Sequence, residues 1–116
     1  MVCPVLLCVQ RPSGYTGNLA SVHDNITNTF VTNMTNSKQT WLGGFQNSSG
    51  EDEPWRWSDG SAWDFENWLE GNPNNNGPNG GGEDYLQVNY GQHATWNDNS
   101  LAGRRRVDGY VCQYKG

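Results

Sequence analysis

The chain has 116 residues, a net charge of -5 at pH 7 and a sequence pI near 4.7. This length fits one domain with one core, so we expect residues 1–116 to form a single domain. The acidic balance argues against nucleic acid as a partner, because a phosphate backbone requires a basic surface. Only 34% of the residues are apolar, but six Trp and five Tyr predict an aromatic core.

The first half of the chain carries the signals for cellular location. Residues 1–9 are apolar like the centre of a signal peptide, although they lack a positively charged start, and no apolar run reaches membrane-spanning length. Three sequons, beginning at Asn25, Asn33 and Asn47, each permit N-glycosylation. Together they favour a secreted glycoprotein.

One helix is predicted near the start, over about residues 25–36. Asp24 stands where an N-cap would accept the first free backbone N–H groups. Apolar residues recur there at near-helical spacing. They are Leu19, Val22, Ile26, Phe30, Val31 and Met34.

Short strands follow the helix. Residues 39–45 read as a buried strand whose glycines allow a close approach of backbone, and residues 85–90 alternate as a strand does. Residues 94–96 are its expected antiparallel partner, and residues 109–113 form the expected terminal strand. The fold class is therefore predicted to be α+β.

A long irregular segment separates these strands. Residues 46–82 contain Trp55, Trp57, Trp63 and Trp68 among Gly, Asn, Asp, Ser and Pro, without a sustained period. A loop of this length in a compact fold is usually functional. We expect its own aromatic side chains to hold it in place.

Polar clusters in the same half offer oxygen ligands. Calcium takes six to eight oxygens from carboxylates, amides and backbone carbonyls. Zinc is not expected, because the His and Cys residues lack zinc-ligand spacing. Asn and Asp clusters are also common turn formers, so both interpretations stay open at this point. The clusters are Glu51–Glu53, Asn72–Asn75, Glu83–Asp84 and Asn97–Asp98.

Over residues 17–113 the order of short motifs resembles the C-type lectin-like domain family. Each motif is weak alone, but seven in the family order are specific. They are GNLASVH (17–23), WLGG (41–44), WRWSDGSAWDFENW (55–68), GNPNN (71–75), ED (83–84), WND (96–98) and YVC (110–112).

The resemblance implies a double-loop fold in which a long irregular loop carries calcium sites above small antiparallel sheets. In sugar-binding members the ion coordinates two vicinal hydroxyls of the sugar. The resemblance also implies a cis peptide bond before Pro73 and a further ligand in the backbone carbonyl of Asp98. By position, the residues that bind calcium and sugar are Asn72, Asn74, Glu83, Asn97 and Asp98.

The sequence departs from the family pattern at several positions. Asn72 stands where the mannose-type motif has Glu, so only Glu83 and Asp98 bring charge and we expect weaker calcium binding. Asn74 leans towards mannose-type sugars. Cys112 matches half of a family disulfide, for which Cys8 is the nearest candidate partner. Residues 1–16 are too short for the family's first strand and helix, which makes this segment atypical or truncated.

The predicted function is calcium-dependent carbohydrate binding by an extracellular module, of the kind used in innate immunity. The alternative is a calcium-independent module for a protein or another surface, which Asn72 and the long loop favour. An enzyme is not expected, because no nucleophile and base pair is apparent in the sequence. Single lectin sites bind weakly, so a homo-oligomer would increase avidity.

Overall fold

The computed structural model describes residues 16–47, 54–74, 84–100 and 107–115. Its elements confirm the predicted α+β class: one helix and short strands, most of them paired antiparallel. In chain order these are β1 (Thr16–Leu19), α1 (Asn25–Asn33), β2 (Thr40–Phe45), β3 (Arg56–Trp57), β4 (Tyr85–Val88), β5 (Trp96–Asn99), β6 (Gly109–Tyr110) and β7 (Cys112–Lys115).

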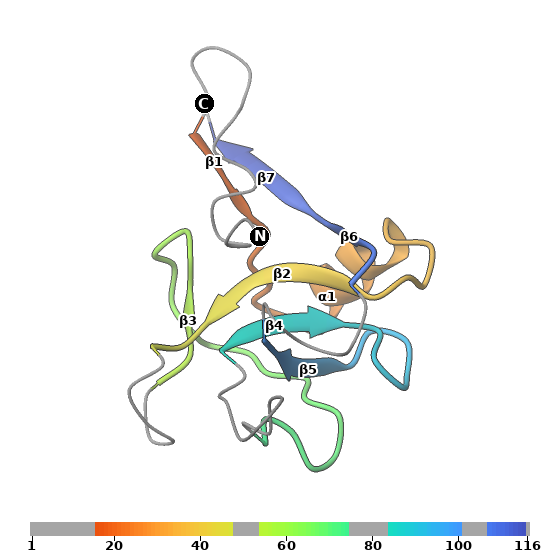
Figure 1. Cartoon of the computed structure of the whole chain (residues 1–116). Helices are drawn as coiled ribbons and strands as arrows, with labels where there is room; N and C mark the ends of the chain where they lie inside the picture. Colours follow the sequence, from red (N-terminus) through yellow and green to blue (C-terminus); the bar gives the residue numbers. More distant parts are fainter. Residues whose placement is uncertain (1–15, 48–53, 75–83, 101–106, 116) are drawn as a thin grey trace.

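The strands form two sheets (Figure 1). In the larger sheet the order is β3-β2-β4-β5, and β6 lies parallel to the first residues of β2. The smaller sheet pairs β1 with β7, so the two ends of the described chain lie side by side. Cys112 at the start of β7 is disulfide-bonded. Its expected partner, Cys8, lies outside the described residues.

Helix α1 begins as predicted but turns an unexpected side inward. The Asp24 side chain accepts a hydrogen bond of 2.7 Å from the backbone N–H of Thr27, and this bond lowers the pKa of Asp24. The helix ends at Asn33, before the predicted end. Its buried residues are Asn28, Val31 and Thr32, whereas Ile26, Phe30 and Met34 are exposed by 82%, 66% and 61%. Three of the six apolar residues that predicted the helix therefore do not mark its buried face.

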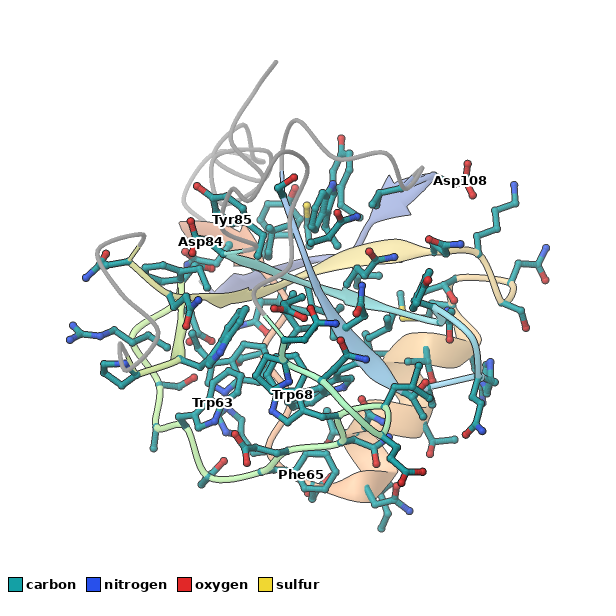
Figure 2. The ribbon with its side chains drawn as sticks, turned by 60° about the horizontal axis from the view of Figure 1, so that its bottom comes forward. Trp63, Phe65, Trp68, Asp84, Tyr85 and Asp108 are labelled. Atoms are coloured by element: carbon teal, nitrogen blue, oxygen red, sulfur yellow. The ribbon has the colours of Figure 1, made fainter. Side chains whose placement is uncertain are left out.

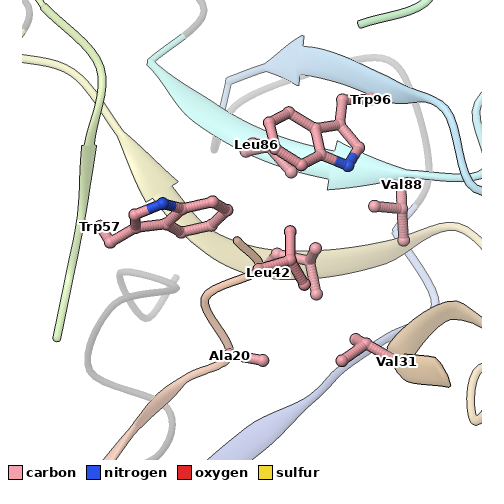
Figure 3. Packing of buried hydrophobic residues seen from close by; sticks show 8 residues of the cluster. Ala20, Val31, Leu42, Trp57, Leu86, Val88 and Trp96 are labelled. Atoms are coloured by element: carbon pink, nitrogen blue, oxygen red, sulfur yellow. The ribbon is translucent and has the colours of Figure 1, made fainter. Parts of the chain in front are cut away.

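The core lies between α1 and the larger sheet and contains two buried indoles (Figure 3). Trp57 is 2% exposed and Trp96 is fully buried. The glycines of β2 allow tight packing, as expected: a Cβ on Gly44 would lie 2.7 Å from Leu86 Cδ1. The buried apolar cluster comprises Ala20, Val22, Val31, Leu42, Trp57, Leu86, Val88 and Trp96.

The predicted strands differ from the structure in their boundaries. Strand β2 begins at Thr40 rather than at residue 39, and β4 ends at Val88 rather than at residue 90. The antiparallel partner of β4 begins at Trp96 rather than ending there, because Asn89 and Ala94 take positive φ angles of 70° and 67° in the turn between the strands. The expected terminal strand over residues 109–113 is two strands. The chain passes at Val111 from the larger sheet to the smaller one, and Val111 N–H donates to Trp41 O.

Asp59 links three segments that are distant in the sequence. Its carboxylate accepts hydrogen bonds of 2.6 Å from both Ser21 Oγ and Gln113 Nε2, and further bonds from the hydroxyl and backbone N–H of Ser61. Partial burial alone would raise the pKa of Asp59, but these bonds outweigh it and lower the pKa. The carboxylate therefore joins the loop after β1, strand β7 and the loop after β3.

We expect Asp59→Ala to lower the free energy of unfolding by about 2–4 kcal/mol, because charged hydrogen bonds to three segments are lost. The folded pKa lies below the unfolded one, so this stabilisation is complete above the unfolded pKa and is lost as pH falls through the folded pKa. Urea unfolding between pH 7 and pH 2 measures both effects. The Asp59→Asn variant should lose less stability on acidification than the native chain. The Glu70→Ala control, at an exposed site, should behave like the native chain. A native-like acid response of Asp59→Asn would contradict the assignment.

Candidate functional site

The irregular segment 54–74 is held against the core by its tryptophans, as predicted. The ring centroids of Trp57 and Trp63 lie 4.6 Å apart, and those of Trp55 and Trp68 lie 5.0 Å apart. Both Trp63 and Trp68 donate their indole N–H to Glu66 Oε2, at 2.8 and 3.2 Å. Figure 2 shows Trp63, Phe65 and Trp68 gathered along this segment. The aromatic contacts give a loop without regular structure a fixed path.

Trp96 attaches this loop to strand β5. The backbone N–H of Trp96 donates to Asn67 O, and its carbonyl accepts from Leu69 N–H, each at 2.9 Å. Trp68, which lies between these two loop residues, therefore forms a parallel β-bridge with Trp96. The indole N–H of Trp96 donates to Asn28 Oδ1 at 2.9 Å. The loop, helix α1 and strand β5 therefore meet at one residue, directly before Asn97 and Asp98.

The loop then turns back to reach Asp98. Asn72 N–H donates to Leu69 O at 2.9 Å, and the Asn72–Pro73 peptide bond is cis, as the family resemblance implied. Asn74 N–H lies 3.1 Å from both carboxylate oxygens of Asp98, whose side chain is fully buried. Residues 24 positions apart are thereby brought into contact.

Asn97 faces away from this contact. Neighbouring residues of a strand point to opposite faces, and Asn97 pairs with Gln87 whereas Asp98 pairs with Leu86. Asn97 Nδ2 donates to Gln87 Oε1 at 3.3 Å, and the same oxygen accepts from Asn99 Nδ2 at 2.6 Å. The structure thus joins Asn74 with Asp98 and places the amide nitrogen of Asn97 in a separate buried network.

This network was not predicted from the sequence. Gln87 Nε2 also donates to Gln39 Oε1 at 2.8 Å, which extends the network to the residue before β2. A signal was present, because Gln87 and the two asparagines occupy alternate positions of paired strands. The alternation of residues 85–90 indicated a strand, but it did not by itself indicate that the polar face of this strand is buried.

Glu83, predicted as a ligand, lies outside the described residues, as do Glu51–Glu53 and Asn75. The next residue, Asp84, is fixed at the start of β4 (Figure 2). Its carbonyl accepts from Gln46 N–H at 3.0 Å and its carboxylate from Gln46 Nε2 at 3.3 Å. Asp84, the residue after Glu83, is therefore anchored to the residue that follows β2.

Among the described residues of the predicted ligand set, one buried side-chain atom lacks a protein partner. Asn72 Oδ1 is buried and makes no hydrogen bond. A buried carbonyl oxygen left unpaired costs about 1–3 kcal/mol, and amide oxygens are good calcium ligands. In the described part of the chain no three His, Cys, Asp or Glu side chains gather as a metal site. An unpaired amide oxygen at Asn72, two residues before the backbone N–H that contacts the buried carboxylate of Asp98, has the chemistry of a calcium ligand.

A second polar cluster connects Ser21, His23 and Asp64 in the order of a nucleophile, a base and an acid. His23 Nδ1 lies 2.6 Å from Asp64 Oδ1, and Nε2 lies 3.2 Å from Ser21 Oγ. Ser21 Oγ donates its single proton to Asp59, so Nε2 of His23 does not accept that proton. We interpret the cluster as an anchor for the tryptophan-rich loop rather than as a catalytic triad.

Comparisons with known proteins agree with this architecture. The family model described as "Lectin C-type domain" matches residues 6–114. Ladderlectin from Oncorhynchus mykiss is 40% identical, over 70% of this chain and 43% of its own. The galactose-specific lectin nattectin from Thalassophryne nattereri is 32% identical, over 83% of this chain and 58% of its own. The chain spans about half the length of these curated relatives.

A solved structure matches this chain over a larger share of its own length than these relatives do. The C-type lectin CEL-I from Cucumaria echinata superimposes with a TM-score of 0.72 at 28% identity, and the match covers 93% of this chain and 77% of that one. In the described parts of the chain no helix has the length and hydrophobicity to span a bilayer. The family match and the arrangement of strands, loop and helix agree, and the chain belongs to the C-type lectin domain family.

Proposed function

We propose that the chain is a calcium-dependent carbohydrate-binding module. Asn72, Asn74, Glu83 and Asp98 are the residues that would hold calcium and the sugar, and Asn97 would join them only by leaving its hydrogen bond with Gln87. The observation that carries the proposal is the turn at Asn72–Asn74, which lies on the buried Asp98 carboxylate and leaves Asn72 Oδ1 without a partner. A bound calcium supplies coordination positions that sugar hydroxyls can take.

The protein groups have distinct roles in this proposal. Asp98 supplies negative charge, and its burial preserves that charge from screening by solvent ions. Asn74 N–H orients the Asp98 carboxylate by touching both of its oxygens. Amide groups at Asn72 and Asn74 both accept and donate hydrogen bonds, so they can contact sugar hydroxyls as well as an ion. Glu83 would provide the second charge.

We infer that the sugar is of the mannose type. This rests on Asn74, which matches the mannose-type motif, whereas Asn72 departs from it. The relative nattectin is named as galactose-specific, so the choice between the two sugar classes needs a direct test.

We further propose an extracellular location and a role in innate recognition. The disulfide of Cys112 supports an oxidising compartment, because disulfides persist there and are rare in the cytosol. Residues 1–116 would act as one binding domain, and association of identical copies would increase the avidity of a weak site.

A second candidate function is calcium-independent binding of a protein or another surface. The Asp98 carboxylate already accepts hydrogen bonds from Asn74 N–H, and Asn97 Nδ2 already donates to Gln87. Part of the predicted ligand set is thus satisfied by protein groups. A measurement of calcium binding separates the two functions.

We predict that the native chain binds calcium and that Asp98→Asn and Glu83→Gln each weaken binding at least about tenfold, because each removes one of two ligand charges. Isothermal titration calorimetry measures the dissociation constants. Asp108→Asn, an exposed carboxylate outside the ligand set, is the matched control and should bind as the native chain does. Circular dichroism without calcium verifies folding. No binding by the native chain at millimolar calcium would reject the proposal in favour of the calcium-independent one.

Asn72→Glu should strengthen calcium binding by about tenfold, because it adds a third carboxylate to the ligand set. Asn72→Gln changes the length of the side chain without the charge and serves as the control. Both variants are compared by calorimetry at the same ionic strength. If Asn72→Glu binds calcium no more tightly than Asn72→Gln, residue 72 is not a ligand.

Mannose should displace the protein from an immobilised mannan surface at a lower concentration than galactose, and removal of calcium by a chelator should abolish binding. The reason is that Asn74 retains the mannose-type arrangement. Surface plasmon resonance with monosaccharide competitors gives the inhibition constants. Stronger competition by galactose would overturn the sugar preference and leave the calcium-dependent function intact.

A further inference from the structure

Helix α1 exposes an apolar stripe to solvent. Ile26, Phe30 and Met34 are spaced four residues apart, so their side chains lie one above another on the helix surface. Their exposed fractions are 82%, 66% and 61%. An exposed apolar patch of this kind on a domain surface promotes association unless something covers it.

Two of the predicted sequons lie on the same helix. Asn25 is its first residue and Asn33 its last, and both are exposed. The middle residue of each sequon, Ile26 or Met34, is an end of the apolar stripe. The potential sites of modification and the stripe therefore occupy one surface.

Asn33 is the better placed of the two to cover the stripe. It follows Phe30 by three residues, so the two side chains are neighbours on the helix. Side chains of a helix lean towards its N-terminus, which directs a group on Asn33 over Phe30 towards Ile26. By the same rule, a group on Asn25 points off the start of the helix and away from the stripe.

We propose that Asn33 carries an N-linked glycan that covers the stripe formed by Ile26, Phe30 and Met34. Its donor would be a lipid-diphosphate-linked oligosaccharide. Asn33 Nδ2 forms a bond to the anomeric carbon, the bond from that carbon to the diphosphate oxygen breaks, and the diphosphate leaves with the electron pair. The amide nitrogen releases one proton to a base of the transferase. The product is bulky and hydrophilic, as a cover for apolar side chains in water must be.

The structure also places this modification before folding. Thr35, the third residue of the sequon, is 8% exposed. Its hydroxyl donates to Thr32 O at 2.6 Å and accepts from Asn89 Nδ2 at 2.8 Å. A transferase that recognises this hydroxyl can reach it only in the unfolded chain, during synthesis. The inference rests on the extracellular location within the proposed function and is independent of calcium binding.

Site mapping provides the first test. The full chain is secreted from a eukaryotic host behind a cleavable leader, and peptide-N-glycosidase F is applied in water labelled with ¹⁸O. The enzyme converts a glycosylated Asn into Asp and adds the heavy isotope. We expect the label at Asn33 in peptide mass spectra, and an unlabelled Asn33 would overturn the proposal.

Variants test the covering role. Asn33→Gln should raise the fluorescence of the apolar dye ANS several-fold and increase self-association in sedimentation velocity. Asn47→Gln, which removes a sequon outside α1, is the matched control and should leave both unchanged. Adding Phe30→Ser to Asn33→Gln should restore the native values, which shows that the stripe and not misfolding causes the change. Equal behaviour of Asn33→Gln and Asn47→Gln would overturn the covering role. Calcium titration of Asn33→Gln tests the lectin function separately.

Discussion

The buried indole of Trp96 is the interaction on which the rest of this structure depends. Its ring contacts Trp57, Trp63, Phe65 and Trp68, with ring centroids 5.6 to 5.8 Å apart. The backbone of Trp96 forms hydrogen bonds with the loop residues on both sides of Trp68. Its indole N–H donates to Asn28 in α1. A loop without regular secondary structure can hold a defined shape here because these contacts replace the hydrogen-bond ladder that it lacks.

The candidate site follows directly from this arrangement. Asp98 is two residues from Trp96 and lies on the same face of β5, where the returning loop brings Asn74 onto its carboxylate. Displacement of Trp96 would therefore move the loop and the carboxylate relative to each other. The aromatic core thus holds the proposed ligand groups, which are far apart in the sequence, at a defined distance.

Buried polar groups contribute to holding this fold together. Gln87, Asn97 and Asn99 are almost fully buried and both asparagines donate to Gln87, while Asp59 joins the loop after β1 to strand β7. Each buried polar group costs free energy unless it is paired, so such networks favour one arrangement over its alternatives. In the described residues four buried side-chain atoms lack a partner, namely Trp57 Nε1, Ser58 Oγ, Asn72 Oδ1 and Ser100 Oγ, and of these Asn72 Oδ1 belongs to the proposed ligand set.

Local patterns in the sequence determined the fold class, the start of α1 at the Asp24 cap, strand β4 and the family, because these depend on neighbouring residues and on motif order. Four of the five proposed ligands fall in described parts of the chain, and two that the family resemblance grouped together, Asn74 and Asp98, are in contact in the structure. Only the tertiary structure decided which face of α1 is buried, because the apolar spacing of Ile26, Phe30 and Met34 does not reveal whether any other element covers that face. Tertiary pairing likewise turned Asn97 away from Asp98 and divided the last strand between two sheets, since these outcomes depend on partners distant in the chain.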